Sequence, residues 1–396
     1  MLKGKSVLIG ITGGIAAYKI AGLCSMLVKL HADTDVMMTE NACQFIAPLT
    51  FETLTNSKCM VDTFDRCFEF DVKHISAAKK ADVFLIAPAT ANVIAKLANG
   101  LADDMLTTTA LACKCPKIIA PAMNTNMYTN PIVQDNLKKL EHYGWTVIPA
   151  DSGRLACGDS GQGKMPSEET LLSYIMREIA AEKDLIGKRV LITAGATQEA
   201  IDPVRYITNH STGKMGYALA QRAMLRGAEV TLVSGKTSIK VPPFVNVIDV
   251  TSAKDMYDAV MQNADRNDII IMAAAVADYR PQSVAENKIK KSDSDMAIHL
   301  ERTDDILATV CKNRRKEQFI CGFSMETENL IENSRKKLSK KGCDMIAANS
   351  LKTEGAGFGT DTNIITLIAK DFEKSLPVMT KENAADCILD EAVRAL

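Results

Sequence analysis

The stretch ITAGATQEAIDPVRYITNHSTGKMG, residues 192–216, marks the start of a βα unit in the middle of the chain. It overlaps the run KRVLIT at 188–193, whose β-branched residues between charges predict a strand buried on both faces of a parallel sheet. Beyond the loop, apolar residues recur at helical spacing until Gly227 ends the predicted helix. The polar residues between this strand and this helix therefore form one long βα loop.

The loop ends at a helix N-terminus, where free backbone N–H groups and the helix dipole favour an anion. Asn209, Ser211 and Thr212 lie there and can either cap the helix or contact a ligand. The alternative is a polar connection with an ordinary cap. A loop of about twenty residues without secondary structure in a compact domain favours a functional site over that alternative.

A complete domain precedes this unit. The run KSVLIGIT at 5–12 predicts a strand, Gly13 and Gly14 a turn, and the apolar stripe within 15–30 a helix. Further buried strands are predicted at 82–88, 116–122 and 146–150, with helices between them. This alternation is typical of βαβ units around a parallel sheet.

The second half repeats the pattern. Strands are predicted at 229–234, 245–250, 268–274, 318–323, 345–348 and 364–369, and helices at 305–313 and 328–341. The sequence therefore predicts an α/β protein of two doubly wound domains, with a boundary near 184–188 that divides it into 1–186 and 187–396. The glycine-rich segment 151–165 has no apolar period and is predicted to be a mobile loop.

Composition excludes several classes of function. The net charge of -1 gives no signal for nucleic acid or for a membrane surface. The 11 cysteines are odd in number and scattered, which indicates a reducing cytoplasm rather than a disulfide framework. Cys113 and Cys115 lack the spacing of a zinc site. The apolar start at 7–18 is broken by two glycines and is too short for a membrane span, so we interpret it as a strand.

Two nucleotide-binding fingerprints are absent. The G-x-G-x-x-G motif fails in both halves, because Thr12 follows Gly10 and Thr197 follows Gly195 at the position of the second glycine. A P-loop also fails, since Met215 stands where that motif requires serine or threonine. A phosphate can still be bound at either helix start.

Three residues of the first half are candidates for chemistry. His74 precedes a predicted helix near the carboxyl rim of the sheet, although a lone histidine is more often a surface or core residue. Asn124 follows a strand, so its amide either faces the crevice and holds a carboxylate or caps the next helix. Cys157 lies in the glycine-rich loop and reaches a ligand when that loop closes.

The motifs of both halves together resemble one family. They are GITGGIAAYK at 10–19, His74, APATANVIAKLANGLADD at 87–104, PAMNTNMY at 121–128, LACGDSGQGKM at 155–165, the stretch at 192–216, AAAVADYR at 273–280, KIKK at 288–291, Gly322 with Phe323, and GFGTDTN at 357–363. Nearly the whole chain is similar to the bacterial coenzyme A biosynthesis enzymes in which phosphopantothenoylcysteine decarboxylase is fused to phosphopantothenate–cysteine ligase.

For the first half, the resemblance implies a flavodoxin-like or Rossmann-like flavoprotein domain that binds FMN and decarboxylates phosphopantothenoylcysteine to 4′-phosphopantetheine. Flavin oxidation of the substrate thiol would create the electron sink that CO₂ loss requires. The implied roles are base or orienting group for His74, carboxylate clamp for Asn124 and proton donor for Cys157. The implied FMN contacts are Gly13, Gly14, Thr39, Pro88, Ala89, Thr90, Ala91 and Asn92. Tyr128 stands where the family commonly has tryptophan.

For the second half, the resemblance implies a Rossmann-like domain that activates 4′-phosphopantothenate with CTP and Mg²⁺ as an acyl-cytidylate, which L-cysteine then attacks. Asn209 would contact the acyl-nucleotide, and Lys288 would neutralise phosphate charge. The implied CTP contacts are Ala273, Ala274, Asp278, Lys288, Asp304, Asp305, Ile306, Leu307, Phe323, Lys337 and Lys341. Asp304 replaces the family's usual proline, and the metal ligands are not assigned.

The resemblance also implies a cytoplasmic homo-oligomer, a dodecamer with trimeric flavin-domain contacts and dimeric ligase-domain contacts. One alternative is a flavin decarboxylase of peptidyl cysteine whose second domain is degenerate. Another is a non-catalytic regulatory subunit. Retention of His74, Asn124 and Cys157 argues against the second alternative, and the intact motifs of the second half argue against the first.

Overall fold

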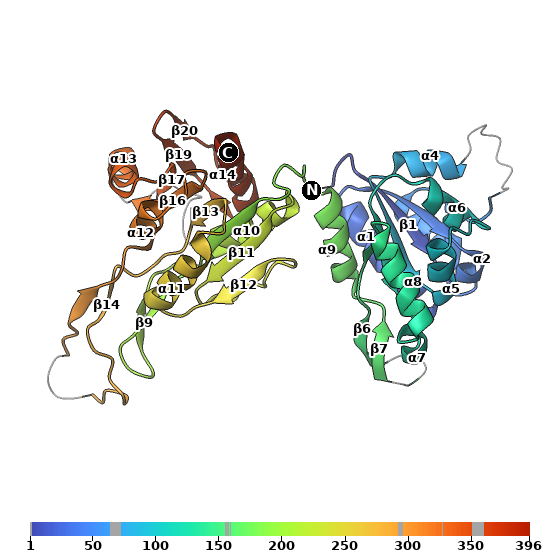
Figure 1. The fold of residues 1–396 in the computed structure, drawn as a ribbon, viewed down its shortest axis with the longest axis horizontal. Helices are drawn as coiled ribbons and strands as arrows, with labels where there is room; N and C mark the ends of the chain where they lie inside the picture. The colour runs from blue at the N-terminus through green and yellow to red at the C-terminus, as the bar shows by residue number, and fades with distance from the viewer. Residues whose placement is uncertain are drawn as a thin grey trace. The chain divides into compact units, whose positions relative to one another are not determined.

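The computed structural model describes residues 2–63, 73–154, 158, 160–291, 296–326, 328–350 and 360–396. The chain forms two compact units, Met1–Ala181 and Glu182–Leu396, each built around its own sheet (Figure 1). We call them the N-terminal and the C-terminal unit. Both combine helices with a mainly parallel sheet, so the predicted α/β class is confirmed.

The N-terminal unit has a five-stranded parallel sheet in the order β2-β1-β3-β4-β5. Its strands are β1 (Ser6–Ile11), β2 (Asp33–Met38), β3 (Val83–Ala89), β4 (Lys117–Pro121) and β5 (Thr146–Val147). This is the flavodoxin-like order, in which successive strands run outward in opposite directions from β1 and β3. The crevice at the carboxyl ends of these two strands is where such sheets bind ligands.

Helices cover both faces of this sheet (Figure 1). They are η1 (Ile15–Lys19), α1 (Ile20–Lys29), α2 (Glu40–Cys43), α3 (Pro48–Thr55), α4 (Lys73–Lys80), α5 (Ala91–Ala98), α6 (Met105–Ala112), α7 (Thr125–Tyr128), α8 (Pro131–His142) and α9 (Glu168–Ile179). Side chains alternate along β1, so Ile9 packs with α1, α3 and α9, while Leu8 packs with α5, α6 and α8. The helix predicted over 15–30 begins with a 3₁₀ turn instead of an α-helical one.

The flanks of the glycine-rich segment differ from the predicted loop, while residues 155–157 and 159 lie outside the described residues. These flanks, β6 (Asp151–Arg154) and β7 (Ser160–Lys164), pair as an antiparallel ribbon. Glycine allows β7 to lie against the loop that contains Met123. An added Cβ at Gly163 would lie 2.3 Å from the Met123 carbonyl oxygen. The segment was predicted to be a mobile loop because strands so rich in glycine carry no apolar alternation.

The C-terminal unit has an eight-stranded sheet in the order β12-β11-β8-β13-β16-β17-β19-β20. The first six strands are parallel and follow the Rossmann order 3-2-1-4-5-6, while β19 pairs antiparallel with both β17 and β20. The bounds are β8 (Arg189–Ala194), β11 (Glu229–Ser234), β12 (Asn246–Asp249), β13 (Ile269–Met272), β16 (Phe319–Glu326), β17 (Met345–Ser350), β19 (Ile365–Ala369) and β20 (Glu373–Ser375).

Five helices are described in this unit, of which α11, α12 and α13 bury one face of the sheet. They are α10 (Lys214–Leu225), α11 (Ala253–Ala264), α12 (Ile306–Lys312), α13 (Leu330–Lys341) and α14 (Lys381–Ala395). Short ribbons pair β9 (Gln198–Ala200) with β10 (Tyr206–Thr208), β14 (Tyr279–Pro281) with β15 (Leu300–Arg302), and β18 (Thr362–Asn363) with β21 (Met379–Thr380). The long loop at 194–213 is therefore a ribbon-bearing segment and not a structureless one.

The junction between β8 and α10 depends on close packing. Gly195 has a φ of +76°, the left-handed region that glycine tolerates best. Gly216 lies in the first turn of α10 against the end of β8, and an added Cβ would fall 2.5 Å from the Ala194 Cβ. The helix therefore meets the strand at a distance that no larger residue permits.

We predict that Gly216→Ala destabilises the C-terminal unit by about 1–3 kcal/mol, because the new methyl group overlaps the strand. The control is Gly22→Ala in α1, where the added Cβ would be 3.6 Å from the Glu168 Cγ and alanine favours the helix. Thermal unfolding of the full chain should show a lower midpoint for Gly216→Ala only. Equal midpoints for both variants and the wild type would contradict the packing argument.

Candidate functional sites

A glycine turn after β1 lies beside the loop that follows β3 in the N-terminal unit. The buried Thr12 hydroxyl donates to the Pro88 carbonyl at 2.6 Å and accepts from the Thr90 N–H at 3.0 Å. Thr90 in turn caps α5, because its hydroxyl accepts the Val93 N–H. One buried side chain thus fixes both loops at the point where the strand order reverses.

Two cavities open at this point and share Gly13 and Thr90. The polar cavity, of about 500 Å³, also contacts Thr39 and Asn92. The apolar cavity, of about 720 Å³, is lined mainly by the segments 13–19, 90–91, 122–127 and 163–165. Both volumes lie within the ordinary range for small-molecule sites.

Carboxylates outnumber cations among the described lining residues of the polar cavity, which include Glu40, Asp62, Asp103 and Asp104 but only one lysine, Lys96. Lys96 forms ion pairs with Asp103 at 2.7 Å and with Asp104 at 3.3 Å, and the hydrogen bond to Asp103 raises the pKa of Lys96. An anionic ligand group here therefore depends on hydroxyl and backbone N–H donors. Thr39, the N-cap of α2, is such a hydroxyl.

Asn124 lines the apolar cavity and also caps α7, since its side-chain oxygen accepts the Asn126 N–H at 2.8 Å. The predicted cap is thus observed, and Asn124 also faces the crevice, whereas its role in holding a carboxylate stays a prediction. The Met123 N–H donates to the Gly163 carbonyl at 3.0 Å, which attaches the loop to β7. Arg154 and Lys164 line the same cavity and were not predicted, because the ribbon that carries them was not recognised.

The remaining predicted residues of this unit are placed differently. Gly14 and Ala91 line the apolar cavity, whereas Pro88 and Ala89 are buried in β3 and line neither cavity. His74 is half-buried in the first turn of α4 and also lines neither cavity. Cys157 lies outside the described residues.

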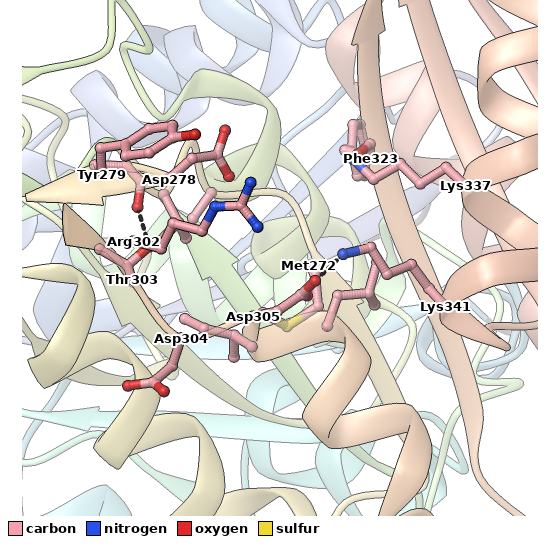
Figure 2. Close-up of a pocket in the computed structure, with 15 residues that line it drawn as sticks. Met272, Asp278, Tyr279, Arg302, Thr303, Asp304, Asp305, Phe323, Lys337 and Lys341 are labelled. Carbon is pink, nitrogen blue, oxygen red and sulfur yellow. Dashed lines mark hydrogen bonds and ion pairs between the residues drawn. The ribbon is translucent and has the colours of Figure 1, made fainter. Parts of the chain in front are cut away.

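The C-terminal unit has a cavity of about 500 Å³ beyond the carboxyl ends of β13 and β16 (Figure 2). We call it the C-terminal cavity. Its lining comprises Met272, Ala274, Val276, Ala277, Asp278, Tyr279, Arg302, Thr303, Asp304, Asp305, Ile306, Leu307, Phe323, Lys337 and Lys341. Every predicted CTP contact is in this set except Ala273 and Lys288. The structure thus gathers residues that the sequence separates by more than sixty positions into one cavity.

Two lysines on one face of α13 border the cavity. Lys337 donates to the Phe323 carbonyl at 2.7 Å, and burial lowers the pKa of its ammonium group. Lys341 forms an ion pair with Asp305, the residue whose carboxylate caps α12. Both cations are therefore positioned by protein contacts before any ligand binds.

Asn209 has a different role from the predicted cap. Its amide donates to the carbonyls of Ala275 at 3.1 Å and Val276 at 3.3 Å, in the loop that borders the C-terminal cavity. The cap of α10 is Gly213, without a capping side chain, so neither Asn209, Ser211 nor Thr212 caps this helix. The backbone of Gly213 adopts the left-handed conformation, which removes the usual capping geometry.

Lys288 is exposed and does not line the cavity, but its neighbour Ile289 is held firmly. The buried Asp202 carboxylate accepts the Ile289 N–H at 3.1 Å and pairs with Arg205 at 2.6 Å. Arg205 also donates to the Ile289 carbonyl at 3.0 Å. Hydrogen bonding to Arg205 lowers the pKa of Asp202 below its ordinary value, so the carboxylate stays charged at neutral pH.

Buried threonines tie the loops of the C-terminal unit as Thr12 does in the N-terminal one. The Thr197 hydroxyl accepts the Ala277 N–H at 3.0 Å, and that of Thr193 accepts the Ala274 N–H at 3.1 Å. Thr12 and Thr197 occupy the positions at which the dinucleotide fingerprint has its second glycine. A threonine side chain at this position keeps a ligand from approaching the backbone as closely as glycine permits. Its hydroxyl instead forms a hydrogen bond that joins two neighbouring loops.

Within the described ranges no group of three or more His, Cys, Asp or Glu side chains is arranged to hold a metal ion. The predicted Mg²⁺ thus has no ligand set of that kind in this part of the chain. Among the same residues, no helix has both the length and the apolar character that a membrane span requires.

Residues 1–180 match the Flavoprotein family model, and residues 185–396 match the DNA/pantothenate metabolism flavoprotein C-terminal domain. The coenzyme A biosynthesis bifunctional protein CoaBC of Bacillus subtilis (strain 168) is 48% identical over 99% of this chain and 97% of its own length. That of Vibrio cholerae is 46% identical over 98% of both chains. A crystal structure of a CoaBC C-terminal domain is 43% identical, covering 54% of this chain and 97% of that one, with a TM-score of 0.46.

We predict that Asp202→Asn exposes the segment around Ile289, because the neutral amide no longer forms the ion pair with Arg205. Limited trypsin digestion should then cleave after Lys288, Lys290 or Lys291 several-fold faster than in the wild type. Asp265→Asn is the control, since Asp265 is 90% exposed and pairs with Arg315 only at 3.8 Å. Cleavage at the wild-type rate in Asp202→Asn would show that the buried carboxylate does not hold this segment.

Proposed function

The chain belongs to the family of coenzyme A biosynthesis bifunctional proteins, and on this basis we propose how its two units divide the family's two reactions. It is a bifunctional enzyme, a phosphopantothenate–cysteine ligase and an FMN-dependent phosphopantothenoylcysteine decarboxylase. We assign decarboxylation to residues 1–186 and ligation to residues 187–396. The observation that carries this assignment is that each unit has its own cavity at the carboxyl edge of its own sheet.

Ligation begins with a carboxylate, which is a poor electrophile until it is activated. In the proposed reaction the carboxylate of 4′-phosphopantothenate attacks the α-phosphate of CTP, forming an acyl-cytidylate and releasing pyrophosphate. The amine of L-cysteine then attacks the acyl carbon, forms the amide and releases CMP. CTP would occupy the C-terminal cavity, in contact with Asp278, Phe323 and the lysines of α13.

Asn209 and Lys288 would act on the reacting groups. The Asn209 amide is fixed against the carbonyls of Ala275 and Val276 at the edge of the cavity, a position that suits contact with the acyl-nucleotide. Lys288 extends from the segment held by Asp202 and would neutralise phosphate charge. Preorganised donors of this kind stabilise charge that develops in the transition state without reorganising at that moment.

The two cavities of the N-terminal unit fit FMN as a pair. The apolar cavity suits a flat ring system, and the polar cavity, joined to it at Gly13 and Thr90, offers hydroxyl donors such as Thr39 for an anionic group. When bound, FMN supplies the oxidation of the substrate thiol that makes loss of CO₂ favourable. The remaining implied contacts, Pro88, Ala89, Ala91 and Asn92, lie in or directly after β3.

The protein residues of decarboxylation would have separate roles. Asn124, in the wall of the apolar cavity, would orient the departing carboxylate. His74 would act as a base or orienting group, and Cys157 would return a proton to the product. We also propose that the enzyme uses Mg²⁺ with CTP, is cytoplasmic and assembles as a homo-oligomer, a dodecamer by family resemblance.

A reciprocal pair of variants tests the division between units. Asn209→Ala should reduce ligation by roughly 10²- to 10³-fold, since one preorganised donor is lost, and should decarboxylate supplied phosphopantothenoylcysteine normally. Asn124→Ala should ligate normally and release little CO₂ from the same compound. Pyrophosphate release with CTP and CO₂ release measured separately distinguish the two effects. Loss of both activities in either variant would contradict the assignment of one reaction to each unit.

A further inference from the structure

Arg302 lies in the wall of the C-terminal cavity and belongs to none of the roles described above. It ends the short strand β15, whose partner β14 carries Tyr279 directly opposite. Figure 2 shows the guanidinium group of Arg302 extending into the space that the other lining residues surround. The described part of the chain provides no ion pair or hydrogen bond for this group.

The β14–β15 ribbon decides which side chains face the cavity. Side chains alternate across a strand, so Arg302 and Tyr279 share one face of the ribbon, and the neighbouring pair Arg280 and Glu301 shares the other. Arg302 and Tyr279 line the cavity, whereas Arg280 binds Glu301 at 2.7 Å and does not line it. Two arginines of one ribbon thus differ in whether they have a partner.

The backbone beside Arg302 is fixed to the wall of the cavity. The Thr303 N–H donates to the Asp278 carbonyl at 3.0 Å, and the Thr303 hydroxyl donates to the Ala277 carbonyl at 2.6 Å. These bonds join the end of β15 to the segment that follows β13. The backbone that carries the Arg302 side chain is therefore held in place by hydrogen bonds on the cavity wall.

The two lysines that line the cavity already have protein partners. Lys341 is paired with Asp305, and Lys337 donates to a carbonyl and has a pKa that burial lowers. The guanidinium group of Arg302 has no such partner among the described residues, and its planar fork matches the oxygens of a phosphate group. A nucleoside triphosphate is a multiply charged anion and requires such a group.

From this geometry we propose that Arg302 binds the phosphates of the nucleoside triphosphate in the C-terminal cavity. The proposal rests on the proposed function, in which this cavity holds CTP. It adds a residue that contacts the phosphates, distinct from those that contact the nucleoside. Arg302 therefore contributes nothing to the binding of cytidine, because cytidine has no phosphate.

Isothermal titration of the full chain with CTP and with cytidine tests the proposal. Arg302→Gln should weaken CTP binding roughly 10- to 100-fold, the effect of losing a charge-assisted contact, and should leave cytidine binding unchanged. Arg280→Gln removes the same charge from the opposite face of the ribbon and should bind both ligands as the wild type does. A thermal unfolding midpoint of the C-terminal unit equal to that of the wild type verifies that each variant is folded.

Each other outcome has a defined meaning. Equal weakening of CTP and cytidine binding in Arg302→Gln would overturn the proposal, because the residue would then shape the cavity and not bind phosphate. Equal weakening of CTP binding in Arg280→Gln would overturn it in favour of a general charge effect. A wild-type chain that binds no CTP would overturn the proposed ligase function as well, whereas tight CTP binding by Arg302→Gln would overturn the inference alone.

Discussion

A buried threonine hydroxyl joins two loops at the switch point of each sheet, and both candidate sites depend on it. Thr12 joins the turn after β1 to the loop after β3, and Thr197 joins the segment after β8 to the loop after β13. Parallel strands bring these loops to one edge, but only a specific contact fixes their separation. The same residues explain why the dinucleotide fingerprint is absent although the strand orders are those of nucleotide-binding sheets.

The cavities follow from how the loops are anchored. In the C-terminal unit, the cavity is enclosed by the β14–β15 ribbon, the start of α12 and one face of α13. Hydrogen bonds of the backbone or the side chain hold Asp278, Asp305 and Lys337 in its wall. In the N-terminal unit, the β6–β7 ribbon lies against the loop of Asn124. Asn124, Asn209 and Lys288 are thus carried on loops, whereas the two lysines of the C-terminal cavity lie on α13.

Sequence reasoning predicted the parallel strands and most of the residues of the C-terminal cavity, since long β-branched runs and distinctive motifs identify them. It did not predict the ribbons, because strands of three residues such as those of Arg302 have no measurable alternation. The α14 helix was also missed, and the orientation of Asn209 depends on two carbonyls that are 66 and 67 residues away in the sequence. Contacts of that range are decided by the fold, and no local pattern contains them.

The central claim is that one chain carries out two consecutive reactions in two separate units. The most direct measurement supplies the purified full chain with 4′-phosphopantothenate, CTP and L-cysteine and follows CMP and CO₂ together. The account predicts that both are released in equal final amounts, with 4′-phosphopantetheine as the product. Release of CMP without CO₂, and accumulation of phosphopantothenoylcysteine, would contradict it.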